Sequence, residues 1–305
     1  MKIAILLATY NGEKYIREQL DSILKQTYKD WVVYVHDDGS KDKTVEILNE
    51  YAGQYPDKIV ILKGASTGGA RNNFFYLMSQ VESDYYMCCD QDDVWLPEKI
   101  EKTVMQMQKL EKGEVDRPLL VFTELTVVDG QMNIIAERMG EYQSLACSDT
   151  SFSRILMQNT VTGCTSLMNR KLRDEALKYT NLNNIIMHDW WIGIIAAYFG
   201  DLCFLDEPTI LYRQHGDNSV GAVDTRTLGY VLGKLNQIKA IKQSLYETRI
   251  QAKEFAETFG LGEDTLAYQY SQSEKMNKFA RLLFYKKNGL KKSGLFRKIG
   301  LIICG

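Results

Sequence analysis

Short apolar runs alternate with amphipathic segments over residues 1–110, and this alternation limits the possible folds more than any other feature of the chain. Residues 3–8 form a continuous apolar run, as expected for a strand that is buried on both faces. In the segment that follows, Ile16, Leu20, Ile23 and Leu24 have the spacing of one helix face. Elements that alternate in this way predict an α/β fold with a mostly parallel sheet, right-handed crossovers and flanking helices.

The same pattern predicts the remaining elements and divides the chain into two regions. Further strands are expected at residues 31–35, 59–62 and 85–89, and helices at 44–51, 72–81 and 97–110. The alternation then breaks up, with strands expected at 119–123, 165–169, 203–205 and 210–213 and a helix at 190–199. From Thr227 the chain reads as mostly helical, with a break at Gly260 and Gly262. We therefore expect an α/β domain over residues 1–220 and a helical extension over residues 221–305.

Composition and cysteine usage indicate the cellular compartment of the protein. Hydrophobic residues make up 45% of the sequence and charged residues 25%, which is enough apolar material for a substantial core. The six cysteines form no CxxC pair, so we interpret them as reduced thiols in the cytoplasm. We find no signal-peptide pattern, and no run reaches the roughly 18 apolar residues of a membrane span. The sequence predicts a soluble or peripheral cytoplasmic protein.

Polar clusters follow four of the predicted strands, where an open parallel sheet places its ligands. The clusters occupy residues 9–12, 37–40, 68–72 and 90–93. Two of them are acidic. That all four clusters follow strands is a stronger argument for a ligand site than any one cluster. The glycines at 64, 68 and 69 fit neither a Walker loop nor a dinucleotide fingerprint.

The cluster at residues 90–93 is a candidate metal site. Asp90, Asp92 and Asp93 place three carboxylates on four residues, and their mutual repulsion would be relieved by a divalent cation. Mg²⁺ and Mn²⁺ are commonly held by one or two carboxylates together with substrate phosphates. A solvated acidic turn before the Pro97 helix is the alternative. The apolar residues on both sides of the cluster favour the metal site.

Other candidates have a plain structural alternative. Asp37 and Asp38 begin a sequence that is typical of a turn. Alternatively, one of the two carboxylates could bind a nucleoside, with the ring of Tyr10 stacking on its base. Asp189 could cap the following helix or act as a general base. His215 could be a surface imidazole or a further ligand of a metal or a phosphate. The residues alone leave each of these choices open.

With these residues assembled, the chain resembles the family 2 glycosyltransferases, which are inverting enzymes of the GT-A fold. The resemblance covers about residues 1–220 and is closest to bacterial rhamnosyltransferases of cell-surface polysaccharide synthesis. Six motifs in order carry it: ATYNG at 8–12, DDGSKD at 37–42, GARNN at 69–73, CDQDDVW at 89–95, HDWW at 188–191 and YRQHGDN at 212–218.

The resemblance implies a role for each matching position and a nucleotide-sugar donor as partner. The donor would be bound by Thr9, Tyr10, Asn11, Asp37, Asp38, Arg71, Asp90 and Gln91. Mg²⁺ or Mn²⁺ would be held by Asp92, Asp90 and His215. Asp189 would be the catalytic base. The acceptor, a saccharide or a lipid-linked saccharide, would meet Gly163, Cys164, Thr165, Trp190 and Trp191.

The last 31 residues differ in charge from the rest of the chain. Residues 275–305 contain nine basic side chains and no acidic one, although the formal net charge of the whole chain is −2. Apolar residues interleave with these basic ones, as in a helix that lies on an anionic membrane. A helix packed on the catalytic domain is the alternative. Nucleic-acid binding fits less well because the rest of the chain is acidic. We expect peripheral binding to the inner face of the cell membrane.

Two other functions are alternatives to glycosyl transfer. A sugar nucleotidyltransferase would carry a glycine-rich basic loop after the first strand, where this chain has Thr9, Tyr10, Asn11 and Gly12. A binding scaffold with a decayed site would not be expected to keep the whole set of acidic candidates and His215. Glycosyl transfer therefore explains the most residues.

Overall fold

A computed structural model describes residues 2–112, 116–216 and 238–305. Within these residues, nine strands form one sheet with the order β3-β2-β1-β4-β8-β6-β9-β5, and β7 pairs with β6. The strands are β1 (Ile3–Thr9), β2 (Trp31–Asp37), β3 (Ile59–Ile61), β4 (Tyr85–Cys89), β5 (Val94–Trp95), β6 (Leu119–Val128), β7 (Ile134–Ala136), β8 (Leu167–Asn169) and β9 (Asp201–Arg213).

The α/β class predicted from the sequence is confirmed, and the sheet is mixed. Strands β3, β2, β1 and β4 are parallel, as are β6 and β9. The short β8, which follows a 3₁₀ turn (Gly163–Thr165), runs antiparallel to both β4 and β6. The two strands expected at 203–205 and 210–213 are one strand, β9, whose register against β6 shifts near Pro208.

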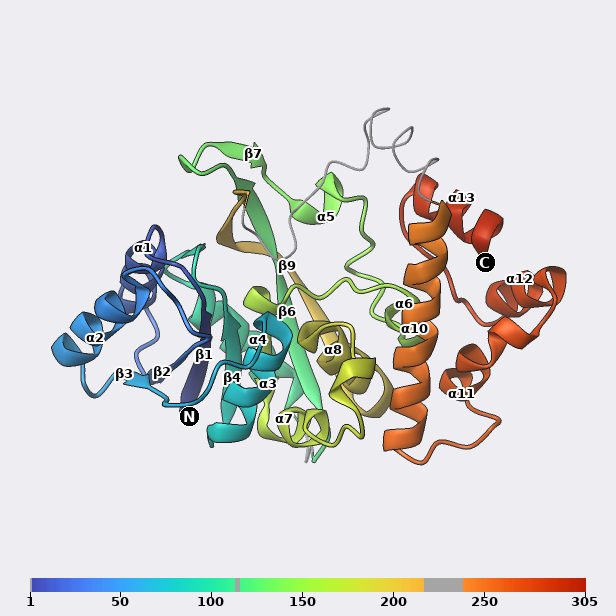
Figure 1. The fold of residues 1–305 in the computed structure, drawn as a ribbon, viewed down its shortest axis with the longest axis horizontal. Helices are drawn as coiled ribbons and strands as arrows, with labels where there is room; N and C mark the ends of the chain where they lie inside the picture. Colours follow the sequence, from blue (N-terminus) through green and yellow to red (C-terminus); the bar gives the residue numbers. More distant parts are fainter. Residues whose placement is uncertain (1, 113–115, 217–237) are drawn as a thin grey trace.

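Helices cover both faces of the sheet (Figure 1). They are α1 (Ile16–Leu24), α2 (Thr44–Gln54), α3 (Ala70–Gln80), α4 (Lys99–Leu110), α5 (Met139–Tyr142), α6 (Phe152–Met157), α7 (Arg170–Ala176) and α8 (His188–Phe199). Side chains of β1 alternate between two cores, since Ile5 and Leu7 pack with α1, α2 and α4 while Leu6 packs with α3, α7 and α8. This alternation is why the first strand reads as continuously apolar.

The C-terminal helices extend the fold at the end opposite α1 and α2 (Figure 1). They are α10 (Ile238–Thr258), α11 (Leu266–Ser271), α12 (Lys278–Lys287) and α13 (Leu295–Cys304). Phe255 of α10 lies in the same core as Trp191 of α8, and a further cluster joins Met157 of α6 to Leu245 and Leu301. The helical extension is therefore packed on the α/β part. The boundary near residue 220 and the end of the motif at 212–218 lie outside the described residues, so the division into two domains stays a prediction.

No helix in the described part of the chain is both long and apolar enough to cross a membrane.

Candidate active site

One cleft of about 830 Å³ opens at the carboxyl ends of β1 and β4 and reaches the C-terminal helices. Seven of the residues predicted for the donor, the metal or the base line it, together with residues that follow α12. The seven are Thr9, Tyr10, Asp38, Asp90, Gln91, Asp92 and Asp189. Residues from all four polar clusters, which follow β1, β2, β3 and β4, are among those that line this cleft.

Asp37 closes the turn after β2. Its Oδ1 accepts a hydrogen bond from Thr9 Oγ1 at 2.9 Å, and its Oδ2 accepts one from the Ser40 amide at 2.8 Å. Asp37 therefore joins the ends of β1 and β2, which is the structural alternative considered for this motif. Asn11 works at the same junction, because its Oδ1 accepts from the Lys41 amide and its own amide donates to Ser40 Oγ.

Asp38 organises the glycine-containing loop beside the cleft. Its carboxylate accepts from the amides of Thr67, Gly68 and Gly69, and the Gly69 bond is 2.7 Å long. Burial alone would raise the pKa of Asp38, but the hydrogen bonds from this loop outweigh it and hold the pKa below its usual value. Asp38 stays ionised and fixes the loop that leads into α3.

Gln91 ties the acidic loop to the loop after β1. Its Oε1 accepts from the Tyr10 amide and its Nε2 donates to the Tyr10 carbonyl, both at 2.9 Å. The two loops lie so close that a Cβ on Gly12 would sit 2.3 Å from Gln91 Oε1. Tyr10 is 54% exposed, so its ring is available to a ligand at a backbone position that Gln91 holds.

Arg71 contacts Asn72 and the backbone of Ile185. Its Nη1 donates to the carbonyl of Ile185 at 2.7 Å, its Nε donates to Asn72 Oδ1, and it is not among the residues that line the cleft. Its contact with a diphosphate stays a prediction.

The acidic loop after β4 meets the end of β9. His215 Nε2 lies 2.7 Å from Asp92 Oδ2, and both side chains are about nine-tenths buried, with exposed fractions of 14% and 13%. Arg213 holds this arrangement, because its Nε donates to the Asp92 carbonyl and its amide donates to Asp93 Oδ1. Its guanidinium also pairs with Glu18 and lies over the ring of Tyr15. Two acidic-loop residues are thus fixed by one buried arginine.

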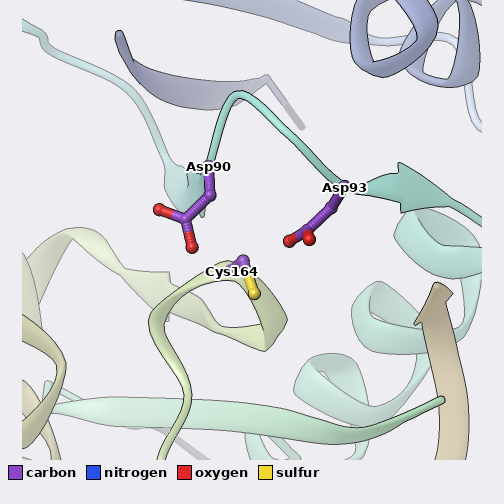
Figure 2. Close-up of side chains that lie close together, drawn as sticks. All are labelled: Asp90, Asp93 and Cys164. Atoms are coloured by element: carbon purple, nitrogen blue, oxygen red, sulfur yellow. The ribbon is translucent and has the colours of Figure 1, made fainter. Parts of the chain in front are cut away.

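Asp90 and Asp93 flank a buried thiol below the loop. Figure 2 shows both carboxylates facing Cys164, and one ligand atom from each of the three residues lies within 4.8 Å of the others. Burial, with Asp92 and Asp189 nearby, raises the pKa of Asp90 to about 7. Burial, with the charges of Asp92 and Asp90, raises the pKa of Asp93 well above its usual value. The site therefore concentrates carboxyl groups, and a bound cation would favour their ionised form.

The donors at this edge fit a hard divalent cation. The oxygens of Asp92 and Asp90 are ligands that Mg²⁺ and Mn²⁺ prefer, and His215 already touches Asp92. Asp93 and Cys164 suit this ion less well, since both are buried and thiolate is a soft ligand. Among the described residues, the ligand atoms found within 4.8 Å of one another are those of Asp90, Asp93 and Cys164, so Asp92, Asp90 and His215 stay the predicted metal ligands on the chemistry of their side chains alone.

Asp189 lies in the cleft at the start of α8. Its Oδ1 accepts from Asn159 Nδ2 at 3.0 Å, and its Oδ2 accepts from the Gly163 amide at 3.1 Å. Burial raises the pKa of Asp189 to about 6 despite these hydrogen bonds. A carboxylate with a pKa close to neutral is better suited to accept a proton than an ordinary one. The Trp190 amide also donates to Oδ1, so the geometry fits a general base oriented by three donors.

The five predicted acceptor residues separate into two groups. Gly163 and Trp190 line the cleft. Cys164, Thr165 and Trp191 are fully buried, and Trp191 packs on Phe255 and Phe259 in the core. Neighbouring tryptophans on a helix point about 100° apart, so only one of the pair can face the cleft.

Some residues at the site were missed by the sequence analysis. Asn159 has no motif around it that marks it as a partner of Asp189. Lys292 and Arg297 were considered only as part of the basic tail, yet both line the cleft. The packing of residues 291–297 against residues 143–158 brings them there, and no local pattern predicts such a contact.

Comparison with known proteins identifies the family. The model of glycosyl transferase family 2 matches residues 4–176. The chain belongs to this family. Among curated relatives, a dTDP-rhamnosyl transferase of Shigella flexneri, RfbG, is 34% identical over 230 residues, covering 71% of this chain and 74% of the relative. The putative glycosyltransferase EpsE of Bacillus subtilis is 32% identical over 127 residues, covering 41% of this chain and 46% of that protein.

Solved structures confirm the GT-A fold. Staphylococcus aureus TarS 1–349 in complex with UDP-GlcNAc matches with a TM-score of 0.54 and 15% identity, covering 100% of this chain and 90% of the other. The mannosyltransferase PcManGT of Pyrobaculum calidifontis, in complex with GDP-Man and Mn²⁺, matches with a TM-score of 0.52 and 15% identity, covering 99% and 85%. At such identity the likeness shows the fold alone.

Proposed function

We propose that the chain is an inverting, metal-dependent glycosyltransferase of cell-surface polysaccharide synthesis. It would transfer L-rhamnose from deoxythymidine-diphosphate rhamnose to a saccharide or a lipid-linked saccharide. The observation that carries this proposal is that the carboxylates of Asp90, Asp92 and Asp189 share one cleft with Thr9, Tyr10 and Asp38. The metal ligands, the base and the residues that bind the nucleoside would then all lie within reach of one bound donor.

Each group would act on a different part of the reaction. When bound, the metal would neutralise the departing diphosphate. Asp92, Asp90 and His215 would hold the metal. Asp189 would take the proton from the acceptor hydroxyl late in the transition state, when that hydroxyl has become acidic. The acceptor oxygen would attack the face opposite the diphosphate, so the anomeric configuration would invert.

The rhamnosyl donor is supported by the Shigella relative, whose printed name specifies dTDP-rhamnose and which is 34% identical over most of both chains. A UDP-hexose is the alternative donor. The TarS structures contain UDP or UDP-GlcNAc, but at 15–17% identity they carry less weight for the donor than this relative does.

Donor binding tests the proposal. Calorimetry with Mn²⁺ should detect binding of deoxythymidine-diphosphate rhamnose, and EDTA should weaken it. Tighter binding of a UDP-hexose would replace the donor and keep the class. If none of the nucleotide sugars binds in the presence of metal, the proposal is wrong. A nucleotidyltransferase would instead release pyrophosphate from a nucleoside triphosphate and a sugar phosphate.

Membrane binding is part of the same proposal. Apolar side chains are exposed on both α12 and α13, including Phe279 at 75% and Leu295 at 65%. The two helices adjoin, because Arg281 donates to the carbonyl of Gly305. Each basic residue near an anionic surface adds about 1 kcal/mol of attraction. An anionic membrane would match both the apolar side chains and the charge of this surface.

Vesicle sedimentation tests this part. Because Tyr285, Leu290 and Leu301 are buried, deletion of the tail would disturb the core, so point substitutions are preferable. Phe279→Ser with Leu283→Ser should reduce binding to phosphatidylglycerol vesicles. Ile134→Ser, at a residue that is 62% exposed on β7, is the matched control. Equal binding by all three proteins would contradict membrane contact through α12.

A further inference from the structure

Two basic side chains in the segment that follows α12 line the part of the cleft that the C-terminal helices form. Lys292 and Arg297 lie in the lining together with Ser244 of α10. Residues 143–163 connect them to the base, since Arg297 Nη1 donates to the Gln143 carbonyl at 2.7 Å and Asn159 donates to Asp189. Gln143 and Asn159 also line the cleft, so this wall runs from the two cations to Asp189.

The position of this segment is fixed by contacts with the α/β part. Ser293 Oγ accepts from the Ala146 amide at 3.1 Å, and the Ser293 amide donates to Gln158 Oε1 at 2.6 Å. On the other side, Arg154 donates to the Lys291 carbonyl. Lys292 stands between these anchored neighbours, so its place at the cleft is set by the backbone.

One of the two cations, Lys292, has no partner within the described residues. Lys291 next to it pairs with Asp149, whereas Lys292 has no ion pair or hydrogen bond with any residue that the structure describes. Burial and the charge of Arg297 lower the pKa of Lys292 to about 8. The first turn of α13 begins between the two cations and adds the positive end of its dipole. An anion bound here would offset the charge of Lys292 and the positive end of the α13 dipole.

An apolar pocket adjoins the two cations. It has a volume of about 180 Å³, lies between α10 and α13, and shares Ser244, Lys292 and Arg297 with the main cleft. Its other walls are mostly apolar side chains, among them Ile241, Leu245, Phe296 and Leu301. A group that is anionic at one end and apolar beyond it matches this pair of surfaces.

We propose that Lys292 and Arg297 bind a phosphate group of the acceptor, and that the pocket between α10 and α13 takes the start of the lipid chain on that phosphate. This inference rests on the proposed function and names its acceptor as a lipid phosphate. The sugar end of the acceptor would then point back toward Asp189. The C-terminal helices would serve the reaction as well as the membrane, because they would complete the acceptor side of the cleft.

Geranyl diphosphate is a suitable probe, used with the full chain and in EDTA so that the metal site does not hold the diphosphate. Wild type should bind it, and Lys292→Gln or Arg297→Gln should each weaken binding about tenfold, which corresponds to about 1.4 kcal/mol. Lys298→Gln removes an equal charge from an exposed position of α13 and should bind as wild type. Lys292→Arg should retain binding.

Other ligands separate the two halves of the proposal. Geraniol should bind far more weakly than geranyl diphosphate, and so should inorganic pyrophosphate. Equal binding of geraniol would overturn the phosphate site, and equal binding of pyrophosphate would overturn the lipid pocket. Equal binding of geranyl diphosphate by wild type and Lys292→Gln would overturn the role of that residue. Nucleotide-sugar binding with Mn²⁺ is measured separately on the same proteins, so that failure of the donor site is recognised independently.

Discussion

His215 Nε2 lies 2.7 Å from Asp92 Oδ2, although 123 residues separate the two in the chain. The contact joins the acidic loop after β4 to the end of β9, and Arg213 supports it from below through the carbonyl of Asp92 and the carboxylate of Asp93. A carboxylate and an imidazole held together at the edge of a cleft can share a cation. This relationship connects the fold to the proposed chemistry.

His215→Ala should weaken metal binding. Loss of even an outer-shell partner typically lowers metal affinity about 10- to 100-fold, so loss of a direct ligand should cost at least about tenfold. Titration of Mn²⁺ against donor binding by calorimetry gives the apparent affinity. The thermal unfolding midpoint controls for damage to the fold. An unchanged Mn²⁺ affinity would exclude His215 from the metal site.

Asp189→Asn should lower kcat about 10²- to 10⁴-fold, the usual contribution of a general base, while donor affinity stays close to that of wild type. The asparagine Oδ1 can still accept from Asn159 and the Trp190 amide, but its Nδ2 would face the Gly163 amide, so one hydrogen bond is lost and the unfolding midpoint should fall slightly. Steady-state kinetics and calorimetry on the same preparation measure the two quantities. A parallel loss of donor affinity would point to a binding role instead.

The rate should depend on pH through Asp189. Burial raises the pKa of this carboxyl to about 6, so the base is protonated at lower pH and kcat/KM should rise as pH increases through about 6. Asn159→Ala removes a hydrogen bond that favours the charged form, so the inflection should move to higher pH. His188 stays neutral throughout, because burial lowers its pKa to about 3. An inflection that does not move in Asn159→Ala would assign the titration to another group, such as Asp90.

Asp38→Asn should loosen the loop at residues 66–69. The amide that replaces one carboxylate oxygen would face backbone N–H groups, and a buried group left without its partner costs about 1–3 kcal/mol of unfolding free energy. Donor affinity should fall as well, because Ser66, Gly68 and Gly69 line the cleft. Chemical denaturation and calorimetry measure these two effects. A variant with full stability would show that Asp38 does not organise the loop.

Gly12→Ala should separate the two loops that Gln91 joins. The new Cβ would lie 2.3 Å from Gln91 Oε1, so the paired hydrogen bonds to Tyr10 should break and donor affinity should fall. Gly53→Ala in α2 is the matched control, since no atom lies within 4 Å of its Cβ position, and it should stabilise the fold by about 0.5–1 kcal/mol. If both variants bind the donor as wild type does, the Gln91 contact is not needed at the site.

The elements of the first 110 residues were predicted closely because buried parallel strands and amphipathic helices have plain periodicity. The prediction was less complete where polar residues are buried. Strand β6 continues beyond the expected 119–123 through Glu124, whose carboxylate accepts from the amides of Leu125 and Met139. In the sequence, a glutamate after an apolar run indicates the end of a strand, and only the hydrogen-bond partners of its carboxylate show that the strand continues.

The site was predictable to the same extent. Strand ends brought Thr9, Asp38, Asp90 and Asp92 to one cleft, as the parallel part of the sheet requires. The sequence did not show that Arg71 turns to Ile185, because that contact depends on tertiary packing. The same holds for Lys292, which reaches the cleft through contacts between distant segments.

Release of nucleoside diphosphate from deoxythymidine-diphosphate rhamnose tests the central claim most directly. Wild type is incubated with Mn²⁺ and a lipid-phosphate saccharide acceptor, beside Asp92→Ala and Asp189→Ala. The account predicts release by wild type that EDTA abolishes and that both variants lack. Release that continues in EDTA, or at the wild-type rate in Asp92→Ala and Asp189→Ala, would contradict it.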